Sequence, residues 1–210
     1  MGIKIISSSE LESLNHIASE FNEIVKENQQ LKSKVDDLNE LQLKLKRKLQ
    51  GTGAVVYDMQ IDKEGNMSYV CVQDKRIYQY DKDRNTVFCK GDVNIFVLSP
   101  YVFPSKRDGK FTDMPFLRAE FSSDHVEIVE LHSDTDGDFC ENKGYGTMMV
   151  NALIRIAKES DCSLITGSLS SVDAETPEAK EKRNGFYKKR GFELSFSDET
   201  ESSGSIRMRL

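Results

Sequence analysis

The sequence contains no C-x-x-C pair, no apolar run of membrane-spanning length and only three histidines. Its four cysteines are widely spaced and its first residues show no signal-peptide pattern, which together indicate reduced thiols and a cytoplasmic protein. About 20 consecutive apolar residues are needed to cross a bilayer, so no membrane partner is expected. His16, His125 and His132 do not follow the spacing of metal ligands, so no metal site is expected either.

Positive charge is scarce outside one short run. The formal net charge is −6, and the first 50 residues hold eight basic and eight acidic residues, so the whole acidic excess lies in the other 160. Only residues 44–48, Lys-Leu-Lys-Arg-Lys, form a basic run, which we interpret as the solvated end of a helix. Nucleic-acid binding depends on clustered positive charge that releases counterions, so a nucleic-acid-associated regulator is the least supported function.

Neither glycine nor proline interrupts residues 3–50. Apolar residues recur there at alternating spacings of three and four, and nine of the eleven positions of the a and d seam are apolar. This pattern predicts a coiled-coil oligomerisation helix over residues 1–50. The a positions are Leu14, Phe21, Asn28, Val35, Gln42 and Leu49, and the d positions are Ile17, Ile24, Leu31, Leu38 and Leu45.

A polar residue in the seam indicates the type of assembly. Leu or Ile at every d position, with Asn28 at an a position, favours a parallel homodimer in fixed register. Glu27 at g and Lys32 at the following e position would pair across such a dimer. Two alternatives remain: a long amphipathic helix packed on its own globular domain, and an antiparallel hairpin. Gly51-Thr52-Gly53 then ends the helix.

The second predicted domain covers residues 51–210, and its first part, residues 51–115, is rich in β-strands. Short runs of β-branched and aromatic residues alternate there with turn signals, which predicts an antiparallel meander. The expected strands are 55–61, 67–72, 76–80, 86–89 and 94–98, followed by a long loop over 100–115.

Two further strands, Phe116–Phe121 and His125–His132, flank the turn Ser122-Ser123-Asp124. In the second strand Val126 and Ile128 alternate, but Val129 and Leu131 follow in the opposite phase. Such a phase slip indicates either a β-bulge or a strand that is buried on both faces.

A glycine-containing turn and a phenol follow these strands. Residues 142–147, Asn-Lys-Gly-Tyr-Gly-Thr, open a helix expected over 148–157. Backbone amides at such a turn, together with the helix dipole, can hold a pyrophosphate, and Lys143 could add charge. Residues 186–192, Phe-Tyr-Lys-Lys-Arg-Gly-Phe, place Tyr187 near the end of a helix expected over 176–189. The remaining expected strands are 163–167, 192–196 and 205–210.

This order of strand, K-G-Y-G-T turn, helix, strand, helix and F-Y-K-K-x-G-F resembles the GCN5-related N-acetyltransferase (GNAT) superfamily over roughly residues 116–210. The resemblance implies an α+β fold, with a mixed, splayed β-sheet flanked by helices and acetyl-CoA as cosubstrate in the cleft. It makes residues 116–210 the acetyl-CoA half. Residues 51–115 become an atypical acceptor half, because strands replace the two helices that wall the acceptor site in the family.

The resemblance also assigns roles to residues. Tyr187 would contact the cofactor and protonate the departing CoA thiolate. The pantetheine arm would pair with backbone at Val129, Glu130, Leu131, His132 and Ser133, and the pyrophosphate would lie on Lys143, Gly144, Tyr145, Gly146 and Thr147.

Acetyl transfer requires a neutral amine, so a general base is expected. Glu130 or Glu127 on the bulged strand could act through water, and Asn184 is either a ligand of the pantetheine arm or a solvated helix residue. We therefore expect an N-acetyltransferase that acts on an amine-bearing small molecule or protein. The alternative is a non-catalytic GNAT-like module that binds CoA or a partner while the coiled coil carries its role.

Overall fold

A computed structural model describes residues 7–82, 85–99, 114–133 and 142–210. Most of the loop predicted over residues 100–115, and residues 134–141, lie outside these ranges. The chain divides into two units, Met1–Lys48 and Leu49–Leu210. Within the described ranges, no helix is both long and apolar enough to cross a bilayer. The same ranges contain no group of His, Cys, Asp or Glu side chains that could hold a metal ion.

One helix, α1 (Ser8–Leu49), accounts for the predicted N-terminal segment. It begins with a reciprocal cap, in which the Ser7 hydroxyl accepts from the Glu10 amide at 3.3 Å and the Glu10 carboxylate accepts from the Ser7 amide at 2.8 Å. It ends before Gly51 and Gly53, whose φ values of 81° and 71° are left-handed. The predicted helix is therefore confirmed, while its pairing with a second copy remains a prediction.

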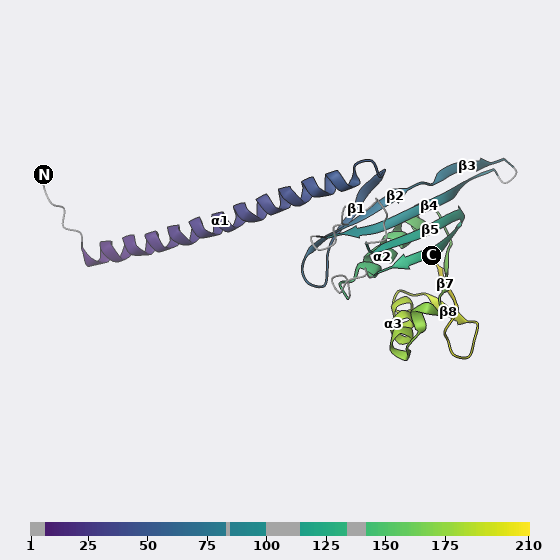
Figure 1. The fold of residues 1–210 in the computed structure, drawn as a ribbon. Coiled ribbons are helices and arrows are strands. Elements are labelled where there is room, and N and C mark those ends of the chain that lie inside the picture. The colour runs from purple at the N-terminus through teal and green to yellow at the C-terminus, as the bar shows by residue number, and fades with distance from the viewer. Residues whose placement is uncertain (1–6, 83–84, 100–113, 134–141) are drawn as a thin grey trace. The chain divides into compact units, whose positions relative to one another are not determined.

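In the second unit, the strands of the described residues form one nine-stranded sheet. Its order is β1-β2-β4-β5-β6-β7-β9-β8, and β3 pairs with β4 beside this path (Figure 1). The strands are β1 (Ala54–Ile61), β2 (Met67–Asp74), β3 (Ile77–Asp81), β4 (Thr86–Leu98), β5 (Phe116–Ser123), β6 (His125–His132), β7 (Leu164–Leu169), β8 (Glu193–Phe196) and β9 (Gly204–Arg209). Antiparallel strands thus occupy residues 54–98, as predicted.

Strand β4 corrects one prediction, because the two runs expected over 86–89 and 94–98 form one 13-residue strand. Its first half pairs with β3 and its second half with β2. The change of partner occurs at Gly91, which has a φ of 130°. A side chain there would approach the Lys75 carbonyl oxygen to 2.8 Å. Gly91 therefore marks a change of partner within one strand.

The sheet is mixed, and it opens beside β6. Strands β6 and β7 are parallel and pair only from His125 opposite Leu164 to Ile128 opposite Gly167, while all other adjacent pairs are antiparallel. Beyond Ile128 the two strands no longer pair. Across β6, Arg118 is opposite Glu130 and Ala119 is opposite Ile128, so Val129 is the extra residue of a bulge. Both the splayed mixed sheet and the bulge are confirmed.

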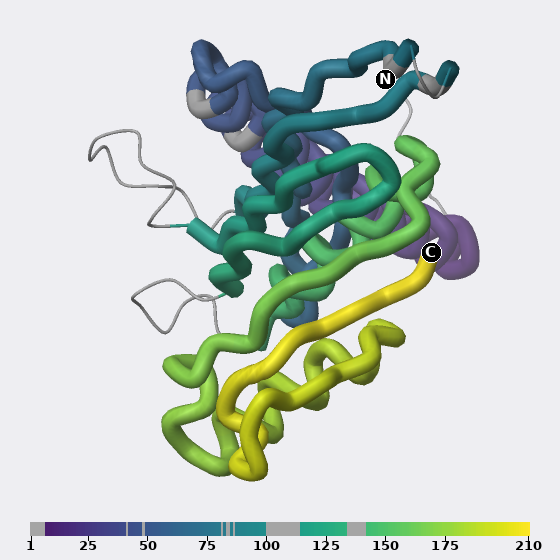
Figure 2. Tube along the Cα trace, turned by 90° about the vertical axis from the view of Figure 1, so that its right-hand side faces the viewer, coloured from purple at the N-terminus to yellow at the C-terminus, as the bar shows by residue number. Residues whose placement is uncertain are grey.

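The helical segments described beside these strands are α2 (Tyr145–Glu159), the short 3₁₀ turn η2 (Val172–Ala174) and α3 (Pro177–Lys188). The buried side chains of α2 include Met149, Leu153 and Ile156, and this helix packs on β1, β2, β4, β5 and β6. Helix α3 lies beside η2 and β8, at the end of the sheet that also holds β9 (Figure 2). The opening beside β6 is therefore flanked by the N-terminus of α2 and by α3.

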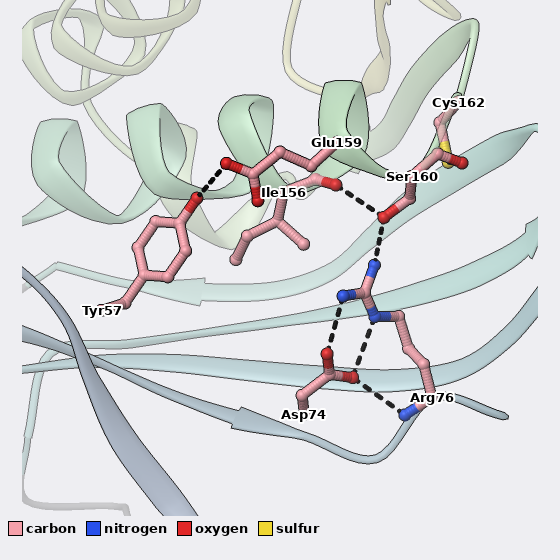
Figure 3. A network of polar contacts seen from close by, with 7 residues as sticks. All are labelled: Tyr57, Asp74, Arg76, Ile156, Glu159, Ser160 and Cys162. Carbon is pink, nitrogen blue, oxygen red and sulfur yellow. Dashed lines mark hydrogen bonds and ion pairs between the residues drawn. The ribbon is translucent and has the colours of Figure 1, made fainter.

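A buried cation holds the C-terminal end of α2 against the sheet (Figure 3). The Arg76 side chain is 8% exposed and binds the Asp74 carboxylate through Nε at 2.9 Å and Nη2 at 2.6 Å. It also donates to the Ser160 hydroxyl, and its guanidinium carbon lies 4.5 Å from the centroid of the Phe121 ring. Burial raises the pKa of the Asp74 carboxyl, but the Arg76 hydrogen bonds outweigh it and leave the pKa below its usual value.

Substituting Arg76 with methionine is expected to lower the free energy of unfolding by about 2 kcal/mol, because it removes charge-assisted hydrogen bonds from a buried position. Arg155→Met is the matched control, since Arg155 also binds an aspartate (Asp58, 2.8 Å) and lies over a ring (Tyr57, 4.8 Å) but is 52% exposed. Arg155→Met should lower the free energy of unfolding by at most about 0.5 kcal/mol. Chemical denaturation measures both, and equal losses would contradict the assigned role of Arg76.

Candidate active site

The N-terminus of α2 provides the first part of the site. Gly144 is the N-cap, and its φ of 92° is a conformation that glycine adopts without strain. No described side chain caps this helix, and its first turn contains no acidic residue. The first amides of a helix lack intrahelical partners and the helix dipole adds partial positive charge, so this end favours an anion.

Gly146 allows three elements to meet at this helix end. A Cβ at this position would lie 3.1 Å from Cε2 of Phe186 on α3 and 3.1 Å from Cβ of Ser133 after β6. Only a residue without a side chain leaves both neighbours in place. The second glycine of the predicted turn is therefore required by close packing.

A hollow of about 640 Å³ lies between the N-terminus of α2 and α3, and we call it the α2 hollow. Its lining residues include the turn from Gly144 to Thr147, as the sequence predicted. Two carboxylates, Glu178 and Glu181, also line it. Four cationic side chains outnumber them: Lys63, Lys182, Lys189 and Arg190. The local charge therefore favours a polyanionic ligand such as a pyrophosphate.

Lys63 reaches this hollow from the turn between β1 and β2. Its amide donates to the Lys143 carbonyl at 3.2 Å, which ties the turn to the segment preceding α2. A Cβ built on Gly144 would lie 3.7 Å from Cγ and Cε of Lys63. The β-rich half of the chain thus contributes one cation to the site.

Arg190 links the two helices that border the α2 hollow. Its guanidinium carbon lies 3.6 Å from the centroid of the Phe186 ring, and it donates to the Phe186 carbonyl and to the Thr147 hydroxyl. Burial lowers the pKa of Arg190, but arginine remains charged near neutral pH. Its position fixes the Phe186 ring against the start of α2.

A second hollow of about 330 Å³ continues from the first and contains Tyr187, so we call it the Tyr187 hollow. Ser133, Lys182 and Phe186 line both hollows, which makes them two parts of one groove. Leu131 and His132 also line the Tyr187 hollow. The structure therefore brings the end of β6 and the phenol together, as the sequence predicted, beside the α2 turn.

Tyr187 is 9% exposed and packs edge-on against Phe186 and Phe192, with ring centroids 5.0 and 5.6 Å away. Burial raises the pKa of Tyr187 to about 12. The phenol is thus a weaker acid than its ordinary value near 10 suggests. A thiol has a pKa near 8.5, so full proton transfer from this phenol to a thiolate is uphill. Hydrogen bonding to the developing thiolate is the role that the site can support.

Lys143 and Tyr145 differ from the predicted arrangement in their side chains. The Lys143 ammonium group pairs with the Glu64 carboxylate in the β1–β2 turn, and Lys143 does not line the α2 hollow. Tyr145 is 1% exposed and donates to Ser99 at 3.0 Å and to Asp62 at 3.3 Å. Lys143 therefore positions the turn, and the cations of the hollow come from other segments.

The bulged strand carries a histidine–carboxylate pair. His132 Nε2 lies 3.0 Å from Glu130 Oε1, and the His132 ring stacks on Phe116 with centroids 4.9 Å apart. Arg118 Nε lies 3.9 Å from the other Glu130 oxygen. Glu130 and Val129 do not line the Tyr187 hollow, whereas His132 does. Of this pair, His132 is therefore the member that borders the Tyr187 hollow.

Glu127 and Asn184 are directed elsewhere. Glu127 lines a separate hollow of about 300 Å³ with Lys90 and His125, and Tyr187 does not border it. Asn184 is 6% exposed, and its amide oxygen accepts from Arg183 at 3.0 and 3.1 Å. It is not the solvated residue considered from the sequence, and it lines neither hollow of the groove.

Sequence reasoning missed the four cations of the α2 hollow. On α3, Lys182, Phe186 and Lys189 are spaced by four and three residues, which places them on one face of the helix. That spacing could have revealed two of the cations once the helix was assigned. Nothing in the local sequence of the β1–β2 turn indicates that Lys63 reaches the same site.

Comparison with known proteins gives similarity in structure only. No protein-family model matches the sequence, and no curated protein matches it. The PaiA N-acetyltransferase of Thermoplasma acidophilum, solved with coenzyme A, is similar over 57% of this chain and 61% of its own, less than two thirds, at 12% identity and a TM-score of 0.40. The GNAT domain of S. lividans PAT is similar over 73% and 96%, at 12% identity and a TM-score of 0.44. An acetyltransferase of Bacillus cereus ATCC 14579 is similar over 100% and 98%, at 15% identity and a TM-score of 0.30.

The order of elements from β5 to β9 agrees with the order expected from the sequence. A strand, a glycine turn, a helix, a parallel strand, a second helix and two closing strands follow one another as the resemblance implied. The sheet opens between its one parallel pair after Ile128. Residues 116–210 therefore have the order of elements and the splayed sheet that the resemblance to the GNAT superfamily implied, and the long helix α1 precedes the sheet in the sequence.

Proposed function

We propose that this chain is an N-acetyltransferase that moves an acetyl group from acetyl-CoA to the amine of an acceptor. The observation that carries the proposal is the continuous groove. It begins at the N-terminus of α2 among four cations and ends beside the buried phenol of Tyr187, where β6 parts from β7. A phosphorylated cofactor with a reactive thioester at its far end fits that distribution of charge.

The proposed reaction uses residues along the whole groove. A C–N bond forms between the acetyl carbon and the acceptor amine, one amine proton passes to a base, and the C–S bond breaks so that CoA departs as the thiolate, which then takes up a proton from solvent. The pantetheine arm would run along Leu131, His132 and Ser133, and Tyr187 would hydrogen-bond the departing sulfur. His132, oriented by the Glu130 carboxylate, is placed to accept the proton, since histidine is the commonest general base.

The acceptor is an amine-bearing small molecule or protein. In place of the helices expected in the family, strands β1 to β4 form that half of the domain, so their surface is where the acceptor would enter. The cytoplasmic location expected from the sequence is compatible with this substrate pair, because acetyl-CoA is a soluble intracellular metabolite.

Binding of acetyl-CoA tests the proposal by calorimetry and thermal unfolding. At a ligand concentration 100 times Kd the native state gains about 2.7 kcal/mol, which corresponds to a rise in Tm of roughly 5–10 °C. No shift at millimolar acetyl-CoA would refute the proposal. Binding without turnover on any amine tested would favour the non-catalytic module instead.

Lys189→Glu is expected to weaken acetyl-CoA binding by about tenfold or more, because it replaces a cation of the α2 hollow by an anion beside the phosphates. Lys188→Glu is the matched control: its position is adjacent on α3, it makes the same change of charge, and it does not line the hollow. Equal affinities for the two variants would place the phosphates elsewhere.

A further inference from the structure

Helix α1 carries an apolar stripe that is exposed along most of its length. Seven a and d residues between positions 14 and 38 are 47–64% exposed, and we call them the α1 seam: Leu14, Ile17, Phe21, Ile24, Leu31, Val35 and Leu38. At a rise of 1.5 Å per residue, the 42-residue helix is about 63 Å long. An apolar stripe of this length on a helix marks an interaction surface.

The spacing of the α1 seam specifies what can cover it. A strict seven-residue repeat winds two helices left-handedly around each other, so the partner must be a helix of matching length and repeat. Among the described residues, the other two α-helices have 15 and 12 residues, which is too short to cover the seam in an intrachain hairpin. A second copy of α1 has the required length and repeat.

We propose that α1 pairs with α1 of a second copy as a parallel, in-register, two-stranded coiled coil. The proposal does not depend on the acetyltransferase function.

The two polar seam positions decide the direction of pairing. In a parallel pair, Asn28 faces Asn28 and Gln42 faces Gln42 of the partner, so each amide finds a donor and an acceptor. In a fully overlapped antiparallel pair, a positions face d positions, so Asn28 would meet Leu31 and Gln42 would meet Ile17. Four amides would then be buried without partners. The free-energy cost of burying them exceeds the stabilisation that an exposed ion pair provides.

Charges beside the seam are compatible with the parallel arrangement. Glu27 and Lys32 fall at g and the next e position, where they pair across the interface, and no g and e pair of the series joins like charges. The acidic N-terminal half and the basic C-terminal half would attract each other in an antiparallel pair. Glu40 and Lys44 already pair within the helix at 2.6 Å and are 65% and 52% exposed, so such outward charges contribute little.

Mass measurement on the full chain tests the pairing. Sedimentation equilibrium at micromolar concentration should give 47.8 kDa, twice the 23.9 kDa of one chain. Ile24→Asp with Leu31→Asp places charges in the seam and should weaken dimerisation at least 100-fold, giving monomers. Gln30→Asp with Ser33→Asp adds the same charge at outward positions and should leave the dimer intact. A monomeric wild-type chain, or equal behaviour of the two double variants, would overturn the proposal.

Cross-linking tests the direction and does not depend on the folding of the aspartate variants. Ile17→Cys, at a d position, should oxidise to a covalent dimer, whereas wild type and Asn22→Cys, at an outward b position, should not. All of these chains carry Cys140→Ser, and the remaining Cys71, Cys89 and Cys162 are buried and give little background. If the single variant Ile17→Cys gives no covalent dimer but the double variant Ile17→Cys, Gln42→Cys does, the helices pair antiparallel and the parallel proposal is overturned.

Discussion

Tyr187→Phe is expected to lower kcat by roughly 10²- to 10³-fold and to leave the affinity for acetyl-CoA almost unchanged. The substitution removes only the hydroxyl, and the ring keeps its edge contacts with Phe186 and Phe192. No described residue hydrogen-bonds that hydroxyl, so its loss strands no partner in the free protein. The effect is therefore confined to the step in which negative charge develops on sulfur.

The pH dependence separates this role from that of an acid that gives up its proton. Because burial raises the pKa of Tyr187 to about 12, the phenol stays protonated at every pH below about 10. In a plot of log kcat against pH, wild type and Tyr187→Phe should therefore have the same shape below about pH 10. A basic limb near pH 8 to 9 that disappears in the variant would show that Tyr187 titrates and would contradict the assigned environment.

Glu130→Gln tests the proposed general base, because Glu130 pairs with His132 at the border of the Tyr187 hollow. If the Glu130 carboxylate orients the His132 ring and pairs with the imidazolium that forms when the ring accepts the amine proton, kcat should fall by 10²-fold or less. Acetyl-CoA binding should not change, since Glu130 does not line the groove. A loss of binding without a loss of kcat would show that Glu130 supports the pantetheine arm instead.

The acetyl-CoA half of the fold was predictable because its signals are local. The phase slip at Val129 marked the bulge, Gly144 marked the start of α2, and Thr176 with Pro177 marked the start of α3, where the Thr176 hydroxyl accepts from the Ala179 amide at 3.1 Å. Each of these features requires one residue type at one backbone position. The resemblance then supplied the order in which the elements join the sheet.

Features that depend on distant partners were not predictable in the same way. The continuity of β4 through Gly91 depends on the close approach of Lys75, which lies in the link between β2 and β3. Lys143 was expected at the phosphates, but Glu64 in a turn 79 residues away binds its ammonium group. Asn184 is buried and bound by Arg183, the residue before it, which also donates to the carbonyls of Ser170 and Ser202 in two loops. No pattern within a single segment carries that information.

Replacing Gly146 by valine is expected to weaken acetyl-CoA binding at least 100-fold, because it closes the groove where its two parts join. The new Cβ would lie 3.1 Å from both Phe186 and Ser133, which line both hollows. The Phe186 ring cannot move away freely, since Arg190 lies 3.6 Å from its centroid on one side and Tyr187 packs against its edge. The displaced groups must therefore enter the space of the ligand.

The cost to stability should be smaller than the cost to binding. Overfilling a packed site typically lowers the free energy of unfolding by about 1–3 kcal/mol, so the variant should remain folded and show a native circular dichroism spectrum. Gly185→Ala is the matched control, because Gly185 also lines the α2 hollow but nothing lies within 4 Å of an added Cβ. In the interior of α3 that change should stabilise the helix by about 0.5–1 kcal/mol and preserve binding. If Gly146→Val binds acetyl-CoA as tightly as Gly185→Ala, the cofactor does not pass between Ser133 and Phe186, and the groove is not the binding site.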